Sequence, residues 1–355
     1  MGTLLVTGGA GFIGSHFIRR VLDRTEFTGS VINFDALTYA GNPESLADVV
    51  EKHRSRYRFV KGDLVDREAV RRVFQELKPD AVVHFAAESH VDRSIHGPEA
   101  FVKTNILGTF NLLESAREAW KDRSDVLFHH VSTDEVFGSL GAEGFFTEST
   151  PYDPRSPYSA SKAAADHLVR AAWHTFHLPY TLTNCSNNYG SHCFPEKMIP
   201  VMVENMLAGK PLPVYGEGKN VREWIHVEDH VDGIFTVMTR SKPGETWLLG
   251  SGEERCNLDL VHALCDLAGP RLGKTAADMR ALITFVKDRP GHDHRYAIDA
   301  SRVKRELGWS PRWNLEKGLE ATFDWYRANR TWVERVKSGA YRDWMKQNYG
   351  ERGPS

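Results

Sequence analysis

Short apolar runs alternate with longer amphipathic stretches through the first half of the chain. The short runs have the length of buried strands, and the longer stretches carry apolar residues at helical spacing. We predict strands at Thr3–Thr7, Val31–Asp35, Arg58–Gly62, Ala81–Phe85, Val126–Val131 and Tyr180–Asn184. We predict helices at residues 12–24, Glu44–Lys52, Arg67–Leu77, Glu99–Trp120 and Pro157–Phe176. This alternation is typical of an α/β fold, a doubly wound parallel sheet with helices on both faces.

A glycine-rich turn follows the first predicted strand. Residues 8–14 read Gly-Gly-Ala-Gly-Phe-Ile-Gly, and glycines at this spacing let backbone N–H groups approach a pyrophosphate at a helix N-terminus. Asp35 ends the second predicted strand, where a carboxylate accepts a hydrogen bond from a ribose 2′-hydroxyl and repels a 2′-phosphate. A glycine turn without a ligand is disfavoured, because strand, turn, helix, strand and acid occur in order. The pattern predicts a Rossmann-type sheet that binds NAD+ rather than NADP+.

The regular alternation ends after Asn184, where Pro and Gly begin to interrupt the segments. We therefore predict an NAD-binding Rossmann domain over residues 1–184 and a smaller C-terminal α/β substrate lobe over residues 185–355. Some of the chain is expected to cross back from the lobe to the domain. Residues 349–355 are expected to fray at the end of the chain.

Two short motifs carry the candidate chemistry, Ser132–Glu135 and Tyr158–Lys162. Tyr158 and Lys162 are four residues apart on a predicted helix, so the ammonium can lie about 5–6 Å from the phenol and lower its pKa. A phenolate can take a proton from a secondary alcohol while a hydride leaves for nicotinamide. Tyr and Lys at this spacing also occur by chance on amphipathic helices. The spacing alone leaves a helix cap or a solvated turn open as the role of Asp134 and Glu135.

Composition narrows the class of protein. The chain has 355 residues, 41% of them hydrophobic, and a formal charge of -2, which suits a large core plus a smaller one and gives no sign of a nucleic-acid partner. No apolar run is long enough to span a bilayer, no signal peptide precedes the first strand, and the four cysteines form no C-x-x-C pair. We expect a cytoplasmic enzyme without a membrane partner. No metal is expected, because the run His292–His294 lacks a compact set of four ligands.

The chain resembles the extended short-chain dehydrogenase/reductases and, more narrowly, the dTDP-glucose 4,6-dehydratases. The resemblance covers residues 4–309 and rests on the segments Asp35–Asn42, Glu88–Ser94, Ser132–Val136, Asn187–Gly190, Phe194–Lys197, Val227–His230 and Asp288–Asp293. It implies conversion of dTDP-glucose to dTDP-4-keto-6-deoxyglucose and water. The steps are oxidation at C4, elimination of water across C5 and C6, and return of the hydride to C6. It also implies a tightly bound NAD+ that is regenerated in each turnover.

The resemblance implies a role for each catalytic residue. Tyr158 takes the O4 proton, and Lys162 lowers the Tyr158 pKa and holds the nicotinamide ribose. Glu135 is the base at C5, Asp134 is the acid that protonates the departing 6-hydroxyl, and Thr133 hydrogen-bonds O4. This scheme requires Asp134 to be neutral while Glu135 is ionised.

The resemblance also implies two sets of binding residues. The expected cofactor contacts are Gly8, Gly11, Phe12, Ile13, Gly14, Asp35, Leu37, Thr38, Asp63, Leu64, Phe85, Ala86, Ala87, Ser89, Thr104, Tyr158, Lys162 and Asn188. The expected substrate contacts are Ser89, Thr133, Asn187, Lys197, Met198, Pro213, Tyr215, Arg222, Asn257, Arg289 and His292. Both arginines suit bidentate bonds to phosphate. A homodimer is expected through a four-helix bundle of Glu99–Trp120 and Pro157–Phe176.

Several alternatives stay open at this stage. Residues 191–193 and 223–226 depart from the usual sequence of the family and are expected near the nucleotide, so UDP-glucose remains an alternative substrate. A nucleotide-sugar 4-epimerase would share Thr133 and the Tyr–Lys pair but has no use for adjacent Asp and Glu. An idle NAD-binding sensor or scaffold is disfavoured by the complete catalytic set. Asp229 is expected to cap a helix at its N-terminus.

Overall fold

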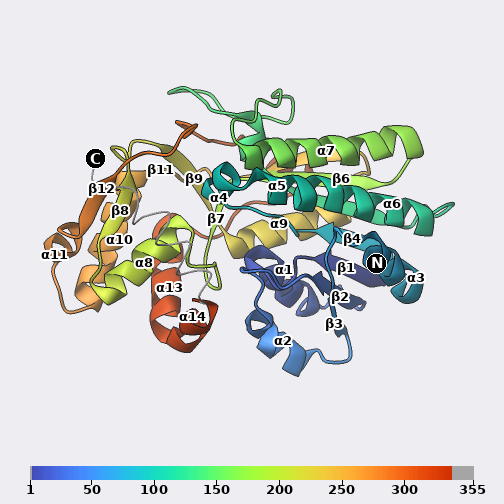
Figure 1. Cartoon of the computed structure of the whole chain (residues 1–355), viewed down its shortest axis with the longest axis horizontal. Coiled ribbons are helices and arrows are strands. Elements are labelled where there is room, and N and C mark those ends of the chain that lie inside the picture. The colour runs from blue at the N-terminus through green and yellow to red at the C-terminus, as the bar shows by residue number, and fades with distance from the viewer. Residues whose placement is uncertain (1, 338–355) are drawn as a thin grey trace.

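A seven-stranded parallel sheet forms the centre of the computed structural model, which describes residues 2–337 (Figure 1). Its strands run in the order β10-β6-β5-β4-β1-β2-β3, and every pairing is parallel. The predicted Rossmann-type fold is therefore confirmed. The segment 349–355, expected to fray, lies outside the described residues. The strands are β1 (Thr3–Thr7), β2 (Ser30–Asp35), β3 (Tyr57–Lys61), β4 (Ala81–His84), β5 (Leu127–Thr133), β6 (Tyr180–Cys185) and β10 (Glu245–Leu249).

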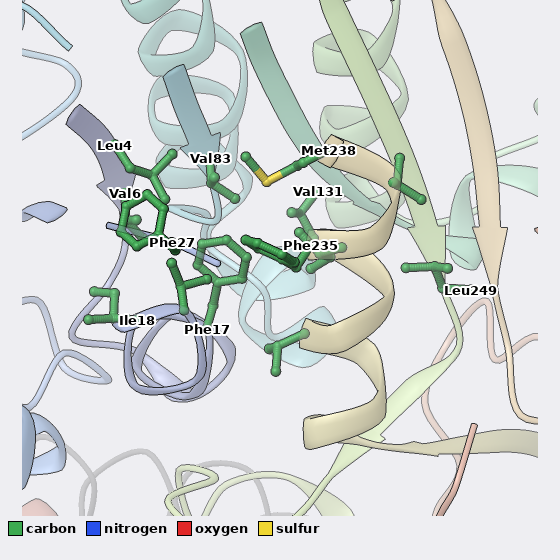
Figure 2. Packing of buried hydrophobic residues seen from close by; sticks show 14 of the residues in the cluster. Leu4, Val6, Phe17, Ile18, Phe27, Val83, Val131, Phe235, Met238 and Leu249 are labelled. Atoms are coloured by element: carbon green, nitrogen blue, oxygen red, sulfur yellow. The ribbon is translucent and has the colours of Figure 1, made fainter. Parts of the chain in front are cut away.

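Alternate residues of the strands face opposite layers of helices, as the pleat requires. Leu4 and Val6 of β1 pack in one buried cluster with α1 (Phe12–Leu22) and α9 (Val227–Arg240), as Figure 2 shows. Leu5, which lies between them, packs in a second cluster with α3 (Arg67–Leu77), α6 (Thr109–Ala119) and α7 (Pro157–Phe176). Because both faces are covered at the centre of the sheet, β1 and β4 are buried and mainly apolar, whereas the edge strand β3 is partly exposed and carries polar residues.

The smaller lobe lies at one end of the molecule, on the left in Figure 1. A three-stranded sheet in the order β11-β9-β7 and the pair β8–β12 form its strands. These are β7 (Asn187–Tyr189), β8 (Leu212–Tyr215), β9 (Val221–His226), β11 (Glu254–Cys256) and β12 (Ile283–Val286). Its helices are α8 (Met198–Ala208), α10 (Asn257–Arg271), α11 (Ala276–Arg280), α13 (Leu315–Ala328) and α14 (Arg330–Val336).

One strand of the main sheet, β10, comes from the part of the chain that we assigned to the smaller lobe. β10 pairs with β6 and forms an edge of the sheet, while α12 (Ser301–Leu307) packs against β10. Our sequence analysis did not identify β10, because its run lies where the regular alternation has lapsed. Its apolar residues Trp247, Leu248 and Leu249 are nevertheless fully buried.

The predicted helix Glu99–Trp120 is present as one run of helical residues up to Ala119, but the run is not α-helical throughout. The structure has α5 (Pro98–Phe101), a π-helical segment η2 (Val102–Gly108) and then α6. Asn105 lies inside the π segment. Its Oδ1 accepts the Glu88 N–H at 2.9 Å, and its Nδ2 donates to the Glu88 carbonyl at 3.0 Å and to Ser161 Oγ at 2.8 Å. A side chain held by distant partners in this way favours a wider turn. Periodicity along the chain contains no signal for such contacts.

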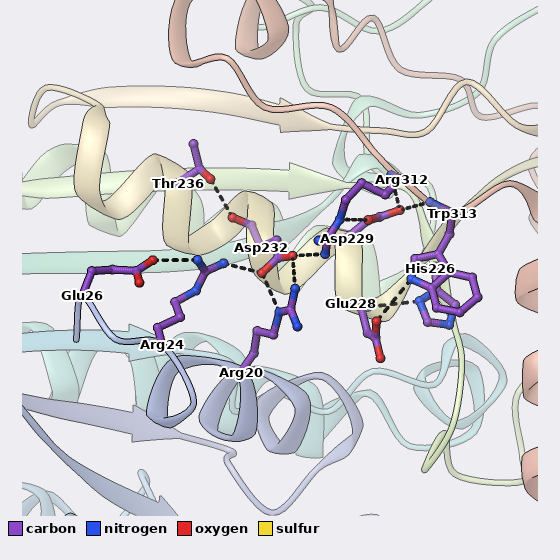
Figure 3. A network of polar contacts seen from close by, with 10 residues as sticks. All are labelled: Arg20, Arg24, Glu26, His226, Glu228, Asp229, Asp232, Thr236, Arg312 and Trp313. Atoms are coloured by element: carbon purple, nitrogen blue, oxygen red, sulfur yellow. Dashed lines mark hydrogen bonds and ion pairs between the residues drawn. The ribbon is translucent and has the colours of Figure 1, made fainter. Parts of the chain in front are cut away.

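Asp229 does not cap α9, so that prediction is wrong. The cap is His226, whose Nδ1 accepts the Glu228 N–H at 3.4 Å. Asp229 lies in the first turn, and its Oδ2 accepts the backbone N–H groups of Arg312 and Trp313 at 2.9 Å each. Figure 3 shows these bonds beside a second cluster, in which Arg20, Arg24 and Arg312 surround Asp232. The cluster joins α1 to α9 and to the segment before α13.

Other differences are small. Pro43–Leu46 is a 3₁₀ turn (η1) that precedes α2 (Ala47–Lys52), and α4 (Val91–His96) was not predicted. The predicted bounds of β1, α3 and α7 agree with the structure. Within the described residues, no helix is both long enough and apolar enough to cross a membrane.

Candidate active site

A cavity of about 450 Å³ lies along the carboxyl ends of the parallel strands and reaches the smaller lobe. It includes the crevice between β1 and β4, where the strand order of a doubly wound sheet reverses and ligands bind. Every predicted catalytic, cofactor and substrate residue except Leu37 lines this one cavity. Residues far apart in the sequence are therefore brought together by the sheet and the lobe.

The glycine turn fits closely against neighbouring backbone. Gly8 has a φ of 69°, and a Cβ added there would lie 2.6 Å from the Ala86 nitrogen. A Cβ on Gly14 would lie 2.3 Å from the Gly8 carbonyl oxygen. Larger residues are excluded at both positions, and the N-terminus of α1 opens into the cavity with Gly11, Phe12 and Ile13 on its wall. This is the geometry that a pyrophosphate requires.

Asp35 links the end of β2 to the glycine turn. Its Oδ2 accepts the Ala10 N–H at 2.9 Å, and its Oδ1 accepts the Leu37 N–H at 2.8 Å. Each oxygen keeps a lone pair for a ligand hydroxyl. Leu37 does not line the cavity and acts through its backbone, in the left-handed region with a φ of 54°. Burial raises the pKa of Asp35, and its two backbone hydrogen bonds oppose that shift.

Thr133, at the end of β5, organises the two acidic residues that follow it. Its Oγ1 accepts the Glu135 N–H at 3.3 Å and donates to Asp134 Oδ1 at 3.2 Å, so Thr133 caps the 3₁₀ turn η3 (Asp134–Phe137). Asp134 is only 2% exposed and Glu135 is partly buried. Neither a helix cap nor a solvated turn therefore describes Asp134 and Glu135.

The two carboxyl groups have different electrostatic surroundings. Burial raises the pKa of Asp134 well above its usual value, and the negative charges of Glu135 and Glu223 raise it further. Burial also raises the pKa of Glu135, but the cations Arg289, Lys197 and Arg222 oppose that shift. Asp134 Oδ2 is buried without a hydrogen-bond partner. Both pKa values are raised, that of Asp134 well above its usual value, so Asp134 keeps its proton to higher pH than Glu135 does.

Tyr158 and Lys162 lie on α7, which begins at a Ser156–Ser159 capping box with Pro157 in its first turn. Burial raises the pKa of Tyr158 well above its usual value, and Glu135 raises it further. Lys162 Nζ donates to the Val131 carbonyl at 2.8 Å. The influence of Lys162 on the Tyr158 pKa stays a prediction, because desolvation of the phenolate dominates the shift in the protein alone.

The smaller lobe supplies polar groups to the far end of the cavity. Asn187 Oδ1, Asn257 Oδ1 and Arg289 Nε line it and are buried without hydrogen-bond partners. Buried polar atoms are normally paired, so this set indicates a polar ligand. Arg222 is less available than we predicted, because Nη1 donates to the Val221 carbonyl at 2.7 Å and Nη2 to the Asp293 carbonyl at 2.9 Å. Lys197 Nζ donates to the Ser89 carbonyl at 2.7 Å.

The segments that depart from the usual family sequence lie mostly outside the cavity wall. Glu223 accepts the N–H groups of Ser251 and Ile298 at 2.6 and 2.7 Å, which makes it a structural link. His226 stacks on Trp313 with ring centroids 4.2 Å apart. Of residues 191–193, only Cys193 lines the cavity.

Tyr296, which sequence reasoning missed, also lines the cavity, as does Trp224, which we expected near the nucleotide but did not name as a contact. The Arg222 guanidinium lies over the Tyr296 ring, 4.2 Å from its centroid. Trp224 is two residues from Arg222 on β9, so strand alternation was the signal that could have found it. Across residues 2–337, no group of three His, Cys, Asp or Glu side chains could hold a metal ion.

Comparisons with known proteins agree with this site. The family model described as GDP-mannose 4,6 dehydratase matches residues 5–322. A dTDP-glucose 4,6-dehydratase from Shigella flexneri is 52% identical, over 98% of this chain and 99% of that protein. The corresponding protein of Xanthomonas campestris pv. campestris (strain B100) is 53% identical, over 96% of this chain and 98% of that protein.

Solved structures that resemble this one include a dTDP-glucose 4,6-dehydratase and a nucleotide-sugar epimerase. A dTDP-glucose 4,6-dehydratase from Streptomyces venezuelae, solved with NAD bound, has a TM-score of 0.86 at 45% identity and covers 94% of this chain and 100% of that one. A UDP-glucose 4-epimerase from Thermus thermophilus has a TM-score of 0.81 at 27% identity, with 92% of this chain and 99% of that one covered. The chain belongs to the dTDP-glucose 4,6-dehydratase family of the extended short-chain dehydrogenase/reductases.

Proposed function

We propose that this protein converts dTDP-glucose to dTDP-4-keto-6-deoxyglucose and water with a tightly held NAD+. The observation that carries the proposal is the pair Asp134 and Glu135, two adjacent carboxyls with different surroundings in the cavity that also contains Tyr158. Oxidation of an alcohol needs only the tyrosine and the lysine. Elimination of water needs a base and an acid in addition.

The cofactor site fits NAD+. The glycine turn has room for a pyrophosphate and for no side chain, and Asp35 offers lone pairs to a ribose hydroxyl. A cofactor held by the glycine turn, Asp35 and Lys162 would supply an acceptor for the C4 hydride, a positive charge in its oxidised form, and in its reduced form the hydride that goes back to C6. Lys162 lines the same cavity and is assigned to bind the nicotinamide ribose.

Tyr158 is the proposed base for oxidation. Its pKa in the protein alone is far above neutral, so its phenolate has to be stabilised by positive charge. Lys162 supplies part of that charge, and Thr133 Oγ1 is placed to hydrogen-bond the O4 oxygen as negative charge develops there. Removal of the O4 proton by Tyr158, together with transfer of the C4 hydride to a bound NAD+, would leave a ketone at C4.

Elimination is proposed to use Glu135 and Asp134. The 4-ketone makes the C5 proton acidic enough for a carboxylate to remove. Glu135 faces three cations that favour its ionised form, whereas Asp134 is the more deeply buried, and the cation Arg222 opposes the upward shift of its pKa. Asp134 therefore keeps a proton that it can give to the departing 6-hydroxyl, and the two neighbours divide the work of base and acid.

Substrate binding is proposed for the lobe side of the cavity. Arg289 and Lys197 carry charge toward a diphosphate, and the unpaired amide oxygens of Asn187 and Asn257 are suitable acceptors for sugar or base groups. Arg222 keeps only part of its hydrogen-bonding capacity for the ligand. The division into an NAD-binding domain over residues 1–184 and a substrate lobe after it is part of the same proposal, with β10 returning to the sheet.

We further propose a homodimer. The helical segments η2 and α6 pack beside α7, and four large apolar side chains on them are exposed, namely Val102, Leu107, Phe110 and Phe176. Pairing these helices with those of a second copy would bury them in a four-helix bundle. All four cysteines are free thiols, which suits the reducing cytoplasm that we assign to this enzyme.

Mass analysis tests the reaction directly. Purified protein is incubated with dTDP-glucose in deuterated water, without added NAD+. We expect loss of one water and gain of one deuterium at C5, with no accumulation of NADH. UDP-glucose is run in parallel and is expected to react more slowly. Unchanged mass with conversion to the galactose isomer would instead establish a 4-epimerase, and no reaction with either sugar would overturn the proposal.

A further inference from the structure

Asp166 is a buried carboxylate that the proposed reaction does not use. It lies on α7 one turn after Lys162 and two turns after Tyr158, so it shares their face of the helix. It is 0% exposed and does not line the cavity. A buried charge is costly unless it is paired and hydrogen-bonded, so its surroundings require an explanation.

Four side chains from three other segments surround this carboxylate. Asp166 Oδ2 accepts hydrogen bonds from Ser132 Oγ and Tyr152 Oη at 2.8 Å each, and Oδ1 lies 3.1 Å from His130 Nε2. Asn184 Nδ2 approaches Oδ2 at 3.5 Å and donates to the Thr133 carbonyl at 3.0 Å. Ser132 and Thr133 form the end of β5. Asp166 therefore links α7, which carries Tyr158 and Lys162, to the end of β5, which is followed directly by Asp134 and Glu135.

The charges around Asp166 show which group needs it. Burial lowers the pKa of His130 to about 4, so this imidazole is neutral at physiological pH. Arg170 reaches the cluster only through Tyr152, to whose Oη it donates at 2.9 Å. Burial raises the pKa of Asp166, but His130, Lys162 and Ser132 outweigh it and the net shift is downward. Lys162 is thus the buried cation that lies one helical turn from an ionised Asp166.

Lys162 needs such a partner. Burial lowers its pKa, and Asp166 is the larger of the two opposing influences, ahead of Cys185. The other groups that face Lys162 are His84 and His130, both with pKa values lowered by burial and therefore neutral, and the Val131 carbonyl, which carries no charge. Burial also raises the pKa of the Cys185 thiol, which leaves it uncharged. Asp166 is therefore the ionised group on which the charge of Lys162 depends.

We propose that Asp166 is a positioning residue that acts through Lys162: its buried carboxylate keeps the Lys162 ammonium charged and holds α7 against the end of β5. The inference rests on the proposed function, in which the charge of Lys162 supports the Tyr158 phenolate. It extends that function by one residue that touches neither substrate nor cofactor.

Unfolding experiments test the pairing without using turnover. Asp166→Asn, Lys162→Met and the double variant are unfolded by heat from about pH 7 to about pH 10. Removing the carboxylate lowers the folded-state pKa of Lys162 further below its unfolded value. At pH values below the Lys162 pKa of the variant, Lys162 is charged in both proteins, so the variant loses the full stabilising contribution of the carboxylate. Above the Lys162 pKa of the wild type, Lys162 is neutral in both proteins and the loss of stability disappears. We expect the melting temperature of Asp166→Asn to recover as pH rises, and to recover at pH 7 when Lys162→Met is added.

Turnover of dTDP-glucose gives the second readout. The alkaline limb of the kcat profile is the fall of kcat as pH rises. In Asp166→Asn we expect this limb to lie at a pH lower by about one unit or more, with KM within about two-fold of the wild-type value. Asp166→Glu keeps the charge and should restore the limb. Tyr152→Phe is the matched control, because it removes one hydrogen bond from Asp166 and leaves its charge. It should lower the melting temperature without moving the limb.

Two outcomes would overturn the inference. One is an alkaline limb that stays in place in Asp166→Asn. The other is a loss of stability that is equal at all pH values and additive with Lys162→Met, which would reveal a purely structural residue. If Asp166→Asn alone does not fold, the double variant decides, since we expect it to fold and its failure would contradict the pairing. Absence of turnover in the wild type would contradict the proposed function and leave the unfolding result standing.

Discussion

The catalytic residues are proposed to act at separate steps, so single substitutions should stop the reaction at different stages. Tyr158→Phe removes the base for oxidation, and we expect kcat to fall by about 10²–10⁴-fold without reduction of NAD+. Glu135→Gln leaves oxidation intact, and we expect a similar fall in kcat with NADH accumulating. Rapid measurement of NADH absorbance after mixing with dTDP-glucose separates the two variants. Dehydrated product formed by Glu135→Gln at the normal rate would show that Glu135 is not the base.

The charge of Glu135 should set the acid limb of the pH profile. Its pKa is raised by burial and held down first by Arg289, and Glu135 must be ionised to act. Activity is therefore expected to fall as pH drops through a value above 4.5, the ordinary pKa of this side chain. Arg289→Gln removes a cation and should move the acid limb to higher pH. The measurement is kcat against pH at saturating dTDP-glucose. A limb that stays in place would show that Arg289 does not act on Glu135.

The element that binds the cofactor tolerates no side chain at its tightest position. An added Cβ at Gly14 would lie 2.3 Å from the Gly8 carbonyl, so Gly14→Ala must displace α1 from the turn. We expect purified Gly14→Ala to retain less than a tenth of the NAD+ retained by wild type and to melt at a lower temperature. Gly141→Ala is the matched control, because nothing lies within 4 Å of its added Cβ. Full retention of NAD+ by Gly14→Ala would contradict this interpretation of the turn.

Elements defined by local sequence were predicted well. The bounds of α3 and α7 agree with the structure, since α7 has its capping box and both helices have apolar residues at helical spacing. The π-helical segment within the predicted helix Glu99–Trp120 could not be foreseen, because it depends on bonds from Asn105 to Glu88 and Ser161. Helical periodicity describes which face is buried and contains nothing about a partner on another segment.

The whole molecule is proposed to work as a dimer, and a charged residue on the helical face tests this. Phe110 is 39% exposed on α6, and burying an aspartate in a four-helix bundle is costly. We expect Phe110→Asp to sediment as a monomer at micromolar concentration while wild type sediments as a dimer. Phe285→Asp is the matched control, since Phe285 is 40% exposed on β12 of the smaller lobe. A Phe110→Asp protein that remains dimeric would place the interface elsewhere.

The residues of the candidate site could be predicted from the sequence, but their pKa values and hydrogen-bond partners could not. All but one of the predicted residues line a single cavity, because the glycine turn, the strand ends and the Tyr–Lys spacing are each legible in short segments. The high pKa of Tyr158 and the partly occupied guanidinium of Arg222 were not foreseen. Both follow from burial between layers, which depends on the positions of distant segments.

The sequence by itself determined the α/β alternation, the glycine turn with Asp35, and the presence of an oxidising pair next to two carboxyls. These features are set by residue spacing within one strand, one turn or one helix. Only the tertiary structure decided that β10 completes the main sheet, that Asp229 accepts hydrogen bonds from the segment before α13, and that Asp166 accepts a hydrogen bond from Ser132 of β5. Each of these depends on contacts between residues distant in sequence and on the exclusion of water, which fixes the charge of every buried group.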